Sequence, residues 1–597
     1  MVGQNLTISR PVYDLVLALS LGTLTFIYVT GGTVINPLNT DWLMFGDAAQ
    51  HYLGWEFFRH TPMLQWPLGA NYPLGMELSS SIVFTDSIPV AAYISKILNP
   101  ILPVTFQYLG IWIWICFFLQ AYFAVKILRV FLCVNSHVYL GSLFLVFSPP
   151  LIYRLIHAGH GHIALASHWL ILAAIYLYLI QKTNDGKWTT LIALSWLIQA
   201  YFAPMVIAIW IASLIRRLIL REHLFGLTKS IAVTSLTSFF VMWSSGYFML
   251  GKDFNPDGWN YVFRWQPLSF VDSGTNNSTG WSFILPDRAQ LDGATEAFSF
   301  LGSGVLLLMT ISLIPLLKNL KLTKIYTLLS ISIGSILVFA TIYLSLPISK
   351  IISVGALLVV VFFSGHLVIQ LLSVPIKYIP LLGAVTLLAI YSMTNHVVLA
   401  QKTLFEYPLF FPLRQFTETF RTHGRSIWPF YYVLIIGSVV YLAQNFKKKF
   451  VVAVLTSMFV FQLIDSAPAI NSARTRFMSV EPWETPMRDS RWDELAQRSA
   501  SILVVPPLND DSEELWIAID DFAIANNLST NSGNFSRSND DQYNLINQQL
   551  INSLKFGTVK DTNLVIVEDP ELWSVLTANS KDFYFIGIID GFRVVSP

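Results

Sequence analysis

The fold follows from a long apolar segment near the amino terminus, which reads YDLVLALSLGTLTFIYVTGGTVI at residues 13–35. A segment of this length can cross the hydrocarbon core of a membrane as a helix. Arg10 precedes it, and no small-residue cleavage site comes before Asn36-Pro37. We therefore expect a retained transmembrane helix rather than a signal peptide.

The composition of the whole chain also indicates a membrane protein. Its 597 residues are 54% hydrophobic and 12% charged, whereas a soluble globular protein carries about 25% charged residues. A net charge of +1 does not support a nucleic-acid partner. The two cysteines, Cys116 and Cys133, are too few for a disulfide framework or a cysteine metal site.

Hydropathy predicts a mainly α-helical, polytopic bundle of about thirteen transmembrane helices, several of them shorter than the usual 20 or so residues. The predicted spans lie near residues 13–35, 108–128, 137–153, 163–181, 188–201, 203–220, 229–250, 299–317, 325–345, 350–373, 378–393, 427–444 and 450–466.

Basic residues orient this bundle. Cytoplasmic loops of membrane proteins carry an excess of lysine and arginine, and one set of loops here is rich in both. We therefore expect the N-terminus in the cytoplasm and, with an odd number of spans, the residues after about 467 outside it. The cytoplasmic set comprises Lys126, Arg129, Lys182, Lys187, Arg216, Arg217, Arg221, Lys318, Lys321, Lys324 and Lys447-Lys448-Lys449.

Two domains are expected. The transmembrane domain covers residues 1–466, and its long outer loops lie at about 37–107, 251–298 and 394–426, the first with two short helices at about 47–59 and 86–98. Residues 467–597 are polar and predict a small extracytoplasmic α/β domain. The strands expected in that domain are Ser501–Val505, Leu564–Val567 and Phe583–Ile588, and the segment Asn526–Asn539 is expected to be a loop.

The best indication of chemistry follows the first span, where residues 41–52 read DWLMFGDAAQHY. Asp47 and Gln50 have the spacing of a capping box that opens a helix, so Asp47 could be a helix cap. On that helix, Asp47, Gln50 and His51 would share a side. A carboxylate, an amide and an imidazole together at a membrane surface suit removal of a proton from a hydroxyl group.

Two other acids have simpler interpretations. Asp41 is interpreted as the solvated end of the first span. Asp86, in Phe84-Thr85-Asp86-Ser87-Ile88-Pro89, is well placed as the N-cap of the helix that follows, with proline in the first turn.

A histidine-rich turn lies between two predicted spans and reads RLIHAGHGH at residues 154–162. The spacing of His157, His160 and His162 allows a zinc site, but no cysteine or acid accompanies it locally. A better interpretation is a set of hydrogen-bond donors, Arg154 included, with glycines that let backbone approach an anion. An ordinary polar turn with interfacial histidines is the remaining alternative.

The outer loops favour arginine, whereas the cytoplasmic loops favour lysine. The planar guanidinium group binds phosphate through two hydrogen bonds, which lysine cannot do. Arg421-Thr422-His423-Gly424-Arg425, just before the span at 427, is the best candidate for binding a lipid phosphate. An ordinary interfacial anchor is equally compatible with this motif.

These features together resemble the GT-C superfamily of polytopic membrane glycosyltransferases. More narrowly, three pieces are similar to a related bacterial family of uncharacterised membrane proteins. The pieces are Gly46-Asp47-Ala48-Ala49-Gln50-His51-Tyr52-Leu53-Gly54-Trp55, Phe84-Thr85-Asp86-Ser87-Ile88-Pro89 and Arg421-Thr422-His423-Gly424-Arg425-Ser426-Ile427-Trp428-Pro429.

The resemblance implies a multi-pass protein of the bacterial inner membrane that transfers a sugar with inversion, from a polyprenyl-phosphate donor to a glycan or lipid-linked acceptor. Asp47 would be the base, oriented by His51 or Gln50. The donor and acceptor would be bound by Arg421, His423, Arg425, Arg154, His160, His162 and Asp86. Membrane lipid is an expected partner and nucleic acid is not. Ala48 follows Asp47 where the superfamily often has a second acid, and a single carboxylate seldom holds a divalent cation alone. This departure argues against a divalent cofactor, and Mg²⁺ or Mn²⁺ is left as an alternative.

Two alternatives come from other classes of protein. A transporter or flippase of a lipid-linked saccharide would need polar groups near the middle of the bilayer, whereas the notable polar groups here cluster at the outer face and charges within the spans are nearly absent. A non-catalytic membrane scaffold whose tail binds glycan is the other alternative.

Overall fold

The computed structural model describes most of the chain. The described residues are 10–76, 78, 81–156, 161–180, 185–251, 263–274, 280–285, 294–318, 374–399, 401–478, 481–507, 515–560, 562–578 and 583–596. The spans predicted at 325–345 and 350–373, and also His157 and His160, lie outside these residues.

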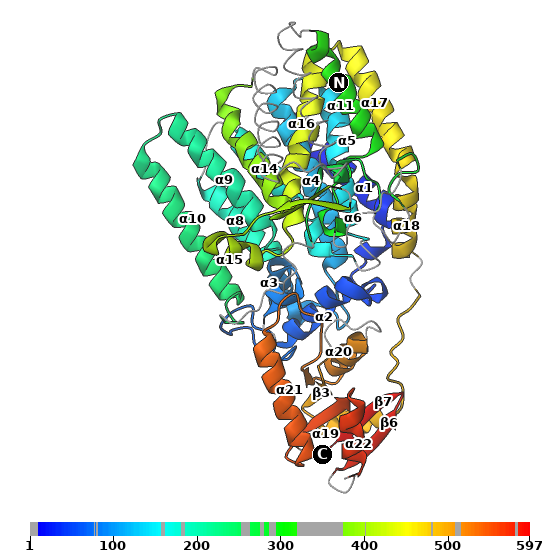
Figure 1. The fold of residues 1–597 in the computed structure, drawn as a ribbon. Helices are drawn as coiled ribbons and strands as arrows, with labels where there is room; N and C mark the ends of the chain where they lie inside the picture. The colour runs from blue at the N-terminus through cyan, green and yellow to red at the C-terminus, as the bar shows by residue number, and fades with distance from the viewer. Residues whose placement is uncertain are drawn as a thin grey trace, which may run out of the picture.

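A bundle of long helices forms one part of the molecule, and a small α/β region forms the opposite end (Figure 1). The helices of the bundle are α1 (Arg10–Thr30), α4 (Leu109–Phe131), α5 (Asn135–Val146), α6 (Pro149–Tyr153), α7 (Trp169–Leu179), α8 (Asp185–Ile198), α9 (Phe202–Ile219), α10 (Leu224–Ser245), α11 (Ser303–Lys318), α14 (Ile379–Ser392), α16 (Trp428–Asn445), α17 (Lys448–Asp465) and α18 (Ala467–Met478).

Six helical segments in the described part of the chain are long and apolar enough to cross a membrane, or seven if the bent pair α17 and α18 counts as one span. In the described part of the chain, the structure does not support as many spans as hydropathy predicted. The predicted segment at 188–201 is α8, a helix of 14 residues, and α7 has 11 residues. Apolar composition alone overestimates spans, because a short apolar helix can be buried among its neighbours instead of crossing the bilayer.

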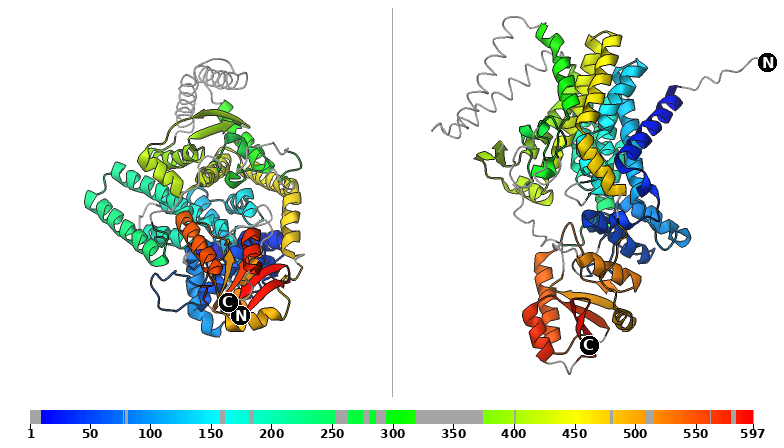
Figure 2. Two further views of the ribbon diagram at one scale, coloured as in Figure 1. Left: turned by 60° about the horizontal axis from the view of Figure 1, so that its bottom comes forward. Right: turned by 90° about the vertical axis from the view of Figure 1, so that its right-hand side faces the viewer.

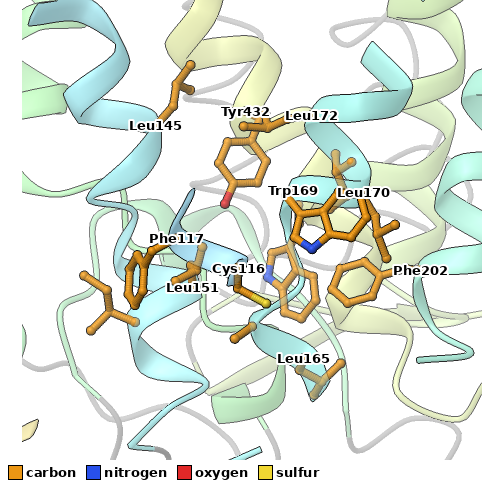
Figure 3. Packing of buried hydrophobic residues seen from close by; sticks show 14 of the residues in the cluster. Cys116, Phe117, Leu145, Leu151, Leu165, Trp169, Leu170, Leu172, Phe202 and Tyr432 are labelled. Atoms are coloured by element: carbon orange, nitrogen blue, oxygen red, sulfur yellow. The ribbon is translucent and has the colours of Figure 1, made fainter. Parts of the chain in front are cut away.

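The bundle encloses the main apolar core, part of which Figure 3 shows around Cys116, Phe117, Trp169 and Phe202. Tyr432 brings a hydroxyl group into this core. Its polar neighbours satisfy it: Gln120 Nε2 donates to the Tyr432 hydroxyl at 3.0 Å, and His168 Nδ1 lies 2.8 Å from the same oxygen. His168 is therefore part of a buried hydrogen-bond network. Polar groups inside a packed apolar interior are usually hydrogen-bonded in this way.

The loop after α1 forms two helices, α2 (Gly46–His60) and α3 (Pro89–Leu98), and their prediction near 47–59 and 86–98 is confirmed. A short 3₁₀ helix, η3 (Ile82–Thr85), lies between them in the sequence. Both helices lie between the bundle and the C-terminal sheet (Figures 1 and 2). We refer to this region as the α2–α3 end of the bundle.

The C-terminal region has a five-stranded sheet with the order β4-β3-β5-β7-β6. Strand β3 is parallel to β4 and β5, whereas β7 is antiparallel to β5 and β6. All five residues of β3 are buried, as expected of a central strand covered on both faces. The strands are β3 (Ser501–Val505), β4 (Ser529–Thr530), β5 (Asn563–Val567), β6 (Phe585–Ile589) and β7 (Phe592–Ser596).

These strands confirm the predicted small α/β region and its three predicted strands within two residues. The prediction missed β7 and the two-residue β4 within the predicted loop. The helices packed around the sheet are α19 (Arg491–Arg498), α20 (Leu515–Ala525), α21 (Asp540–Lys555) and α22 (Pro570–Ala578).

The core of the C-terminal region includes residues from the loop after α1. Phe57 of α2 and Leu74 belong to the same apolar cluster as Trp492, Ile519 and Phe522. Thr530 N also donates to the Pro73 carbonyl at 2.8 Å, which extends the contact through backbone. The sheet region is thus packed directly onto the α2–α3 end.

Candidate functional site

Helix α2 begins at Gly46, whose φ of 54° lies in the left-handed region that glycine adopts without steric cost. Asp47 therefore lies in the first turn, where the helix dipole favours a carboxylate, and not at the N-cap. Phe45 is the N-cap and makes no side-chain capping bond. The predicted capping box is wrong, because Gln50 Nε2 donates instead to the Phe84 carbonyl at 3.1 Å.

Asp41 lies beyond the end of α1 and is partly exposed. Its Oδ1 accepts a hydrogen bond from the backbone N–H of Trp483 at 3.2 Å. The carboxylate thus ties the loop after α1 to the segment that leads into the C-terminal region, a contact that the sequence did not predict.

Asp86 is the centre of a polar cluster at the α2–α3 end. The carboxylate accepts a hydrogen bond from Gln199 Nε2 at 3.0 Å through Oδ1, and Oδ2 lies 3.4 Å from His162 Nε2. The His162 ring packs edge-on against that of His51, with 4.8 Å between centroids. Three predicted site residues, from α2, the turn after η3 and the loop after α6, therefore meet here.

Asp86 is not the predicted N-cap of α3. It has a left-handed backbone with φ 51° and follows the last residue of η3, whereas Ile88 is the N-cap of α3. Aspartate tolerates this conformation better than most residues. Because of the turn, the Asp86 carboxylate bonds His162 and Gln199 rather than the first turn of α3.

Gly54 permits the close approach of α2 to this turn. A Cβ atom at Gly54 would lie 2.3 Å from Thr85 Oγ1 and 2.6 Å from Ser87 Oγ. These two hydroxyl groups also lie 2.8 Å from each other. Any larger residue at position 54 would push η3, and Asp86 with it, away from α2.

The two central side chains differ in ionisation. Burial lowers the pKa of His51 to about 3; His162 acts in the same direction and Asp86 against it. Burial also acts to raise the pKa of Asp86, but the hydrogen bond and charge of His162, with His51 and Arg425, outweigh it and hold the pKa below its usual value. At neutral pH the cluster therefore contains an Asp86 carboxylate beside a neutral His51 imidazole.

His51 is completely buried. Among the described residues, neither of its ring nitrogens has a hydrogen-bond partner, and Nδ1 of His162 has none either. Buried polar groups are usually paired, so such a group requires an explanation. A functional site is one of the recognised explanations.

A second cluster joins three loops through charge. Glu296 accepts from Arg154 Nη1 at 2.9 Å and from Arg425 Nη2 at 2.6 Å, both through Oε2. Glu296 belongs to η9 (Ala294–Ala297), and Arg425 belongs to η11 (His423–Ile427). Gly424 allows the two segments to touch, since a Cβ atom there would lie 2.3 Å from Ala297 Cβ.

Tyr201 connects the second cluster to a cavity. The Arg425 guanidinium group lies over the Tyr201 ring, 4.5 Å from its centroid, a geometry typical of a cation–π interaction. Tyr201 lies between α8 and α9, two residues after Gln199, which holds Asp86. The two clusters are therefore neighbours across one interhelical turn.

The cavity has a volume of about 250 Å³, and we refer to it as the Asp86 cavity. Its polar wall includes Asp86, Gln199, Tyr201 and Arg537, and most of its other walls are apolar. The lining residues are Val83, Phe84, Asp86, Trp196, Gln199, Ala200, Tyr201, Met242, Tyr247, Phe248, Leu250, Gly251, Thr419, Phe420, Ser536 and Arg537.

The other predicted residues have different positions. His423 Nε2 donates to the Thr417 carbonyl at 3.0 Å and packs on Tyr391, so His423 has a structural contact. Arg421 Nη2 donates to the Ser536 carbonyl beside the cavity. Asp47 is not one of the described residues that line the cavity. His160 lies outside the described residues.

Sequence reasoning missed Glu296, Gln199, Tyr201 and Arg537. Gln199 and Tyr201 had a weak signal, because they are polar residues at the end of the predicted span 188–201. Arg537 had none, since it lies within a Ser- and Asn-rich segment that predicts a loop.

Among the described residues, no three or more His, Cys, Asp or Glu side chains form a group that could hold a metal ion. Asp86 is already bonded to His162 and Gln199.

The chain matches models of two protein families. The family described as "Domain of unknown function (DUF6311)" matches residues 19–374 and 351–467, which is more than half of the chain. The chain belongs to this family. The associated "DUF6311 C-terminal domain" matches residues 491–597, the part that holds the five-stranded sheet. No protein with a curated description matches the chain.

Proposed function

We propose that this chain is a membrane glycosyltransferase that moves a sugar from a polyprenyl-phosphate donor to the hydroxyl group of a glycan or lipid-linked acceptor. The observation that carries the proposal is the Asp86 carboxylate, which is held by His162 and Gln199 on the polar wall of a cavity whose other walls are mostly apolar. Such a cavity suits a substrate with a long apolar chain and a polar reacting end.

The chemistry assigned to Asp86 is general base catalysis. The acceptor oxygen attacks the anomeric carbon of the sugar as its proton passes to the carboxylate. The bond between that carbon and the phosphate oxygen breaks, and the electron pair remains on the phosphate. Attack opposite the leaving group inverts the configuration at the anomeric carbon.

Arginine side chains supply the charge that a departing phosphate requires. Arg425 lies over Tyr201 of the cavity wall, and Arg421 bonds the Ser536 carbonyl beside it. Guanidinium groups stabilise phosphate oxygens through paired, charge-assisted hydrogen bonds. Preorganised positive charge at the leaving group is commonly a large contribution to catalysis.

Two carboxylates are candidates for the base. Asp47 was predicted from the sequence and remains a prediction. We favour Asp86 because it lines the cavity, whereas Asp47 lies in the first turn of α2 and is not among the described lining residues. His51 follows Asp47 by four residues on α2 and packs against His162, which contacts Asp86.

We also propose that the α2–α3 end faces the extracytoplasmic side of the bacterial inner membrane. Tyr201 precedes α9 and lines the cavity, whereas Arg216 and Arg217 lie in the last turn of the same helix. Eighteen residues of helix separate these ends by about 27 Å. A basic end on the cytoplasmic side therefore supports a cavity on the other side.

The test is transfer by the full-length protein in lipid nanodiscs, with a panel of polyprenyl-phosphate hexoses and detection of released polyprenyl phosphate. Asp86→Asn should reduce transfer by about 10²- to 10⁴-fold, and the exposed control Asp493→Asn should not. If Asp47→Asn abolishes transfer and Asp86→Asn does not, Asp47 is the base. Full transfer by both variants would refute the proposal.

A further inference from the structure

The C-terminal region contributes residues to the Asp86 cavity. Ser536 and Arg537 line it, although they follow β4 and belong to the domain that carries the sheet. The segment 531–539 that carries them leaves the sheet at Gly533, whose φ of 134° is a conformation that other residues rarely adopt. The segment then runs onto the bundle.

Hydrogen bonds hold this segment against three parts of the bundle. Ser536 N donates to the Phe84 carbonyl at 2.8 Å, and its carbonyl accepts from Arg421 Nη2 at 3.3 Å. Asn539 Nδ2 donates to the Leu250 carbonyl at 3.3 Å. Phe84 and Leu250 both line the cavity, so the segment is bonded along the cavity wall.

Arg537 lies at the polar wall of the cavity. Its Nη2 donates to the Tyr201 hydroxyl at 3.3 Å and to the Thr419 carbonyl at 3.1 Å, and its Nη1 donates to the Ser536 carbonyl at 2.7 Å. Tyr201 thus has one guanidinium group at its hydroxyl and a second, that of Arg425, over its ring.

The charges around this wall favour an anion. Arg154, Arg421, Arg425 and Arg537 bring four positive charges, and Asp86 with Glu296 brings two negative ones. The pKa of Tyr201 agrees with this balance: burial acts to raise it, but Arg537, Arg425 and Arg421 outweigh burial and lower it. The positive side of the cavity is built by both domains.

We propose that Arg537 binds the phosphate of the lipid-linked donor, so that the C-terminal domain completes the substrate site of the transmembrane domain. This inference rests on the proposed function for the identity of the anion. Arg537 would bond the phosphate beside Tyr201, while Asp86 faces the reacting sugar from the same wall. The domain is then part of the site and not a separate glycan-binding module.

Binding of radiolabelled undecaprenyl phosphate to the full-length protein tests this proposal without requiring turnover. Arg537→Ala should weaken binding by about 10- to 100-fold, as expected for loss of hydrogen bonds to a charged group. Arg537→Lys should recover part of the loss, because it keeps the charge but not the planar fork. Arg491→Ala is the matched control, since Arg491 is exposed on α19 and pairs with Asp489.

Competition identifies the anion. Unlabelled undecaprenyl phosphate should displace the probe, whereas phosphatidylglycerol and inorganic phosphate at equal concentration should not. Equal displacement by phosphatidylglycerol would show a general lipid site and overturn the proposal, and so would equal displacement by inorganic phosphate. Wild-type affinity in Arg537→Ala, or a wild-type protein that does not bind the probe, would overturn it as well.

The two proposals fail separately. Asp86→Asn should still bind undecaprenyl phosphate, because the base is not required for binding the anion. If Arg537→Ala loses binding and Asp86→Asn transfers normally, Arg537 binds the phosphate but Asp86 is not the base. If Arg537→Ala binds normally and Asp86→Asn does not transfer, Asp86 is the base but Arg537 does not bind the phosphate. A melting temperature within a few degrees of wild type would exclude misfolding of Arg537→Ala.

Discussion

Asp86 Oδ2 and His162 Nε2 lie 3.4 Å apart, although the two residues come from different loops of the helical bundle. The contact has an electrostatic consequence. It offsets the burial that would otherwise raise the pKa of Asp86, and so keeps this carboxylate ionised. A carboxylate must be ionised in order to accept a proton from a substrate.

Replacing His162 should therefore change how the activity depends on pH. In His162→Ala the opposing effect of burial remains, so the pKa of Asp86 should rise. The acidic limb of the transfer–pH profile should move to higher pH, because the base becomes protonated earlier. His51 should not contribute to this limb above about pH 4, since its pKa is about 3. Measuring transfer between about pH 4 and 8 checks this, and an unchanged acidic limb would contradict it.

Glu296→Gln should destabilise the fold. Glu296 is the carboxylate that pairs with both Arg154 and Arg425, and its removal leaves two buried guanidinium groups close together. Breaking a buried ion pair from one side typically costs about 3–5 kcal/mol. Thermal unfolding in detergent measures the effect. The double variant Glu296→Gln/Arg154→Met should recover part of the loss, and a stable Glu296→Gln protein would refute the assigned role.

Two buried acids, Glu56 and Asp520, and the half-buried Asp521 lie on the contacting helices α2 and α20 and predict a pH-dependent stability. Burial raises the pKa of Glu56 to about 7 and that of Asp521 to about 6, and it raises the pKa of Asp520 well above the usual value. Among the described residues, neither oxygen of Asp520 has a hydrogen-bond partner.

The folded state therefore retains protons that the unfolded state has lost. The stabilisation is complete below about pH 4, near the unfolded pKa values, and is lost as the pH rises through the folded values near 6 and 7. The melting temperature should fall between about pH 5 and 8. Asp520→Asn should reduce this slope and Asp493→Asn should not. A melting temperature that rises over this interval would contradict the prediction.

Gly54→Ala should impair both folding and transfer. The added methyl group would lie 2.3 Å from Thr85 Oγ1, so the turn that carries Asp86 must shift. Gly437→Ala in α16 is the matched control, because a Cβ atom there has no neighbour within 4 Å. Alanine also favours a helix over glycine by about 1 kcal/mol, so the control should be neutral or slightly stabilising. Equal behaviour of the two variants would exclude a tight contact at Gly54.

Local patterns in the sequence predicted individual elements well. Strand β3 begins and ends at its predicted residues, and α2 lies within one residue of its predicted bounds. Both depend on local periodicity and composition. The prediction of thirteen spans was less reliable, because the same apolar composition occurs in short helices that are packed inside the bundle.

The site was predictable to a smaller degree, because tertiary contacts create it. Asp86 resembles a helix cap in the sequence, and only the left-handed turn after η3 directs it to His162 and Gln199. Arg537 and its neighbour Ser536 are far in the sequence from the other cavity residues, and no local motif distinguishes them. The role of Glu296 could not be predicted from the sequence, because Arg154 and Arg425 come near it only in the folded protein.

The packing of Phe57 and Leu74 into the C-terminal core limits where proteins of this family can be truncated for experiments. A truncation before residue 491 would leave two large apolar side chains of the first loop in water, and an isolated tail would lack part of its own interior. Neither fragment would therefore keep the complete apolar core that the intact protein has. Chimeras between family members should therefore exchange the first loop and the tail together, as one packed unit.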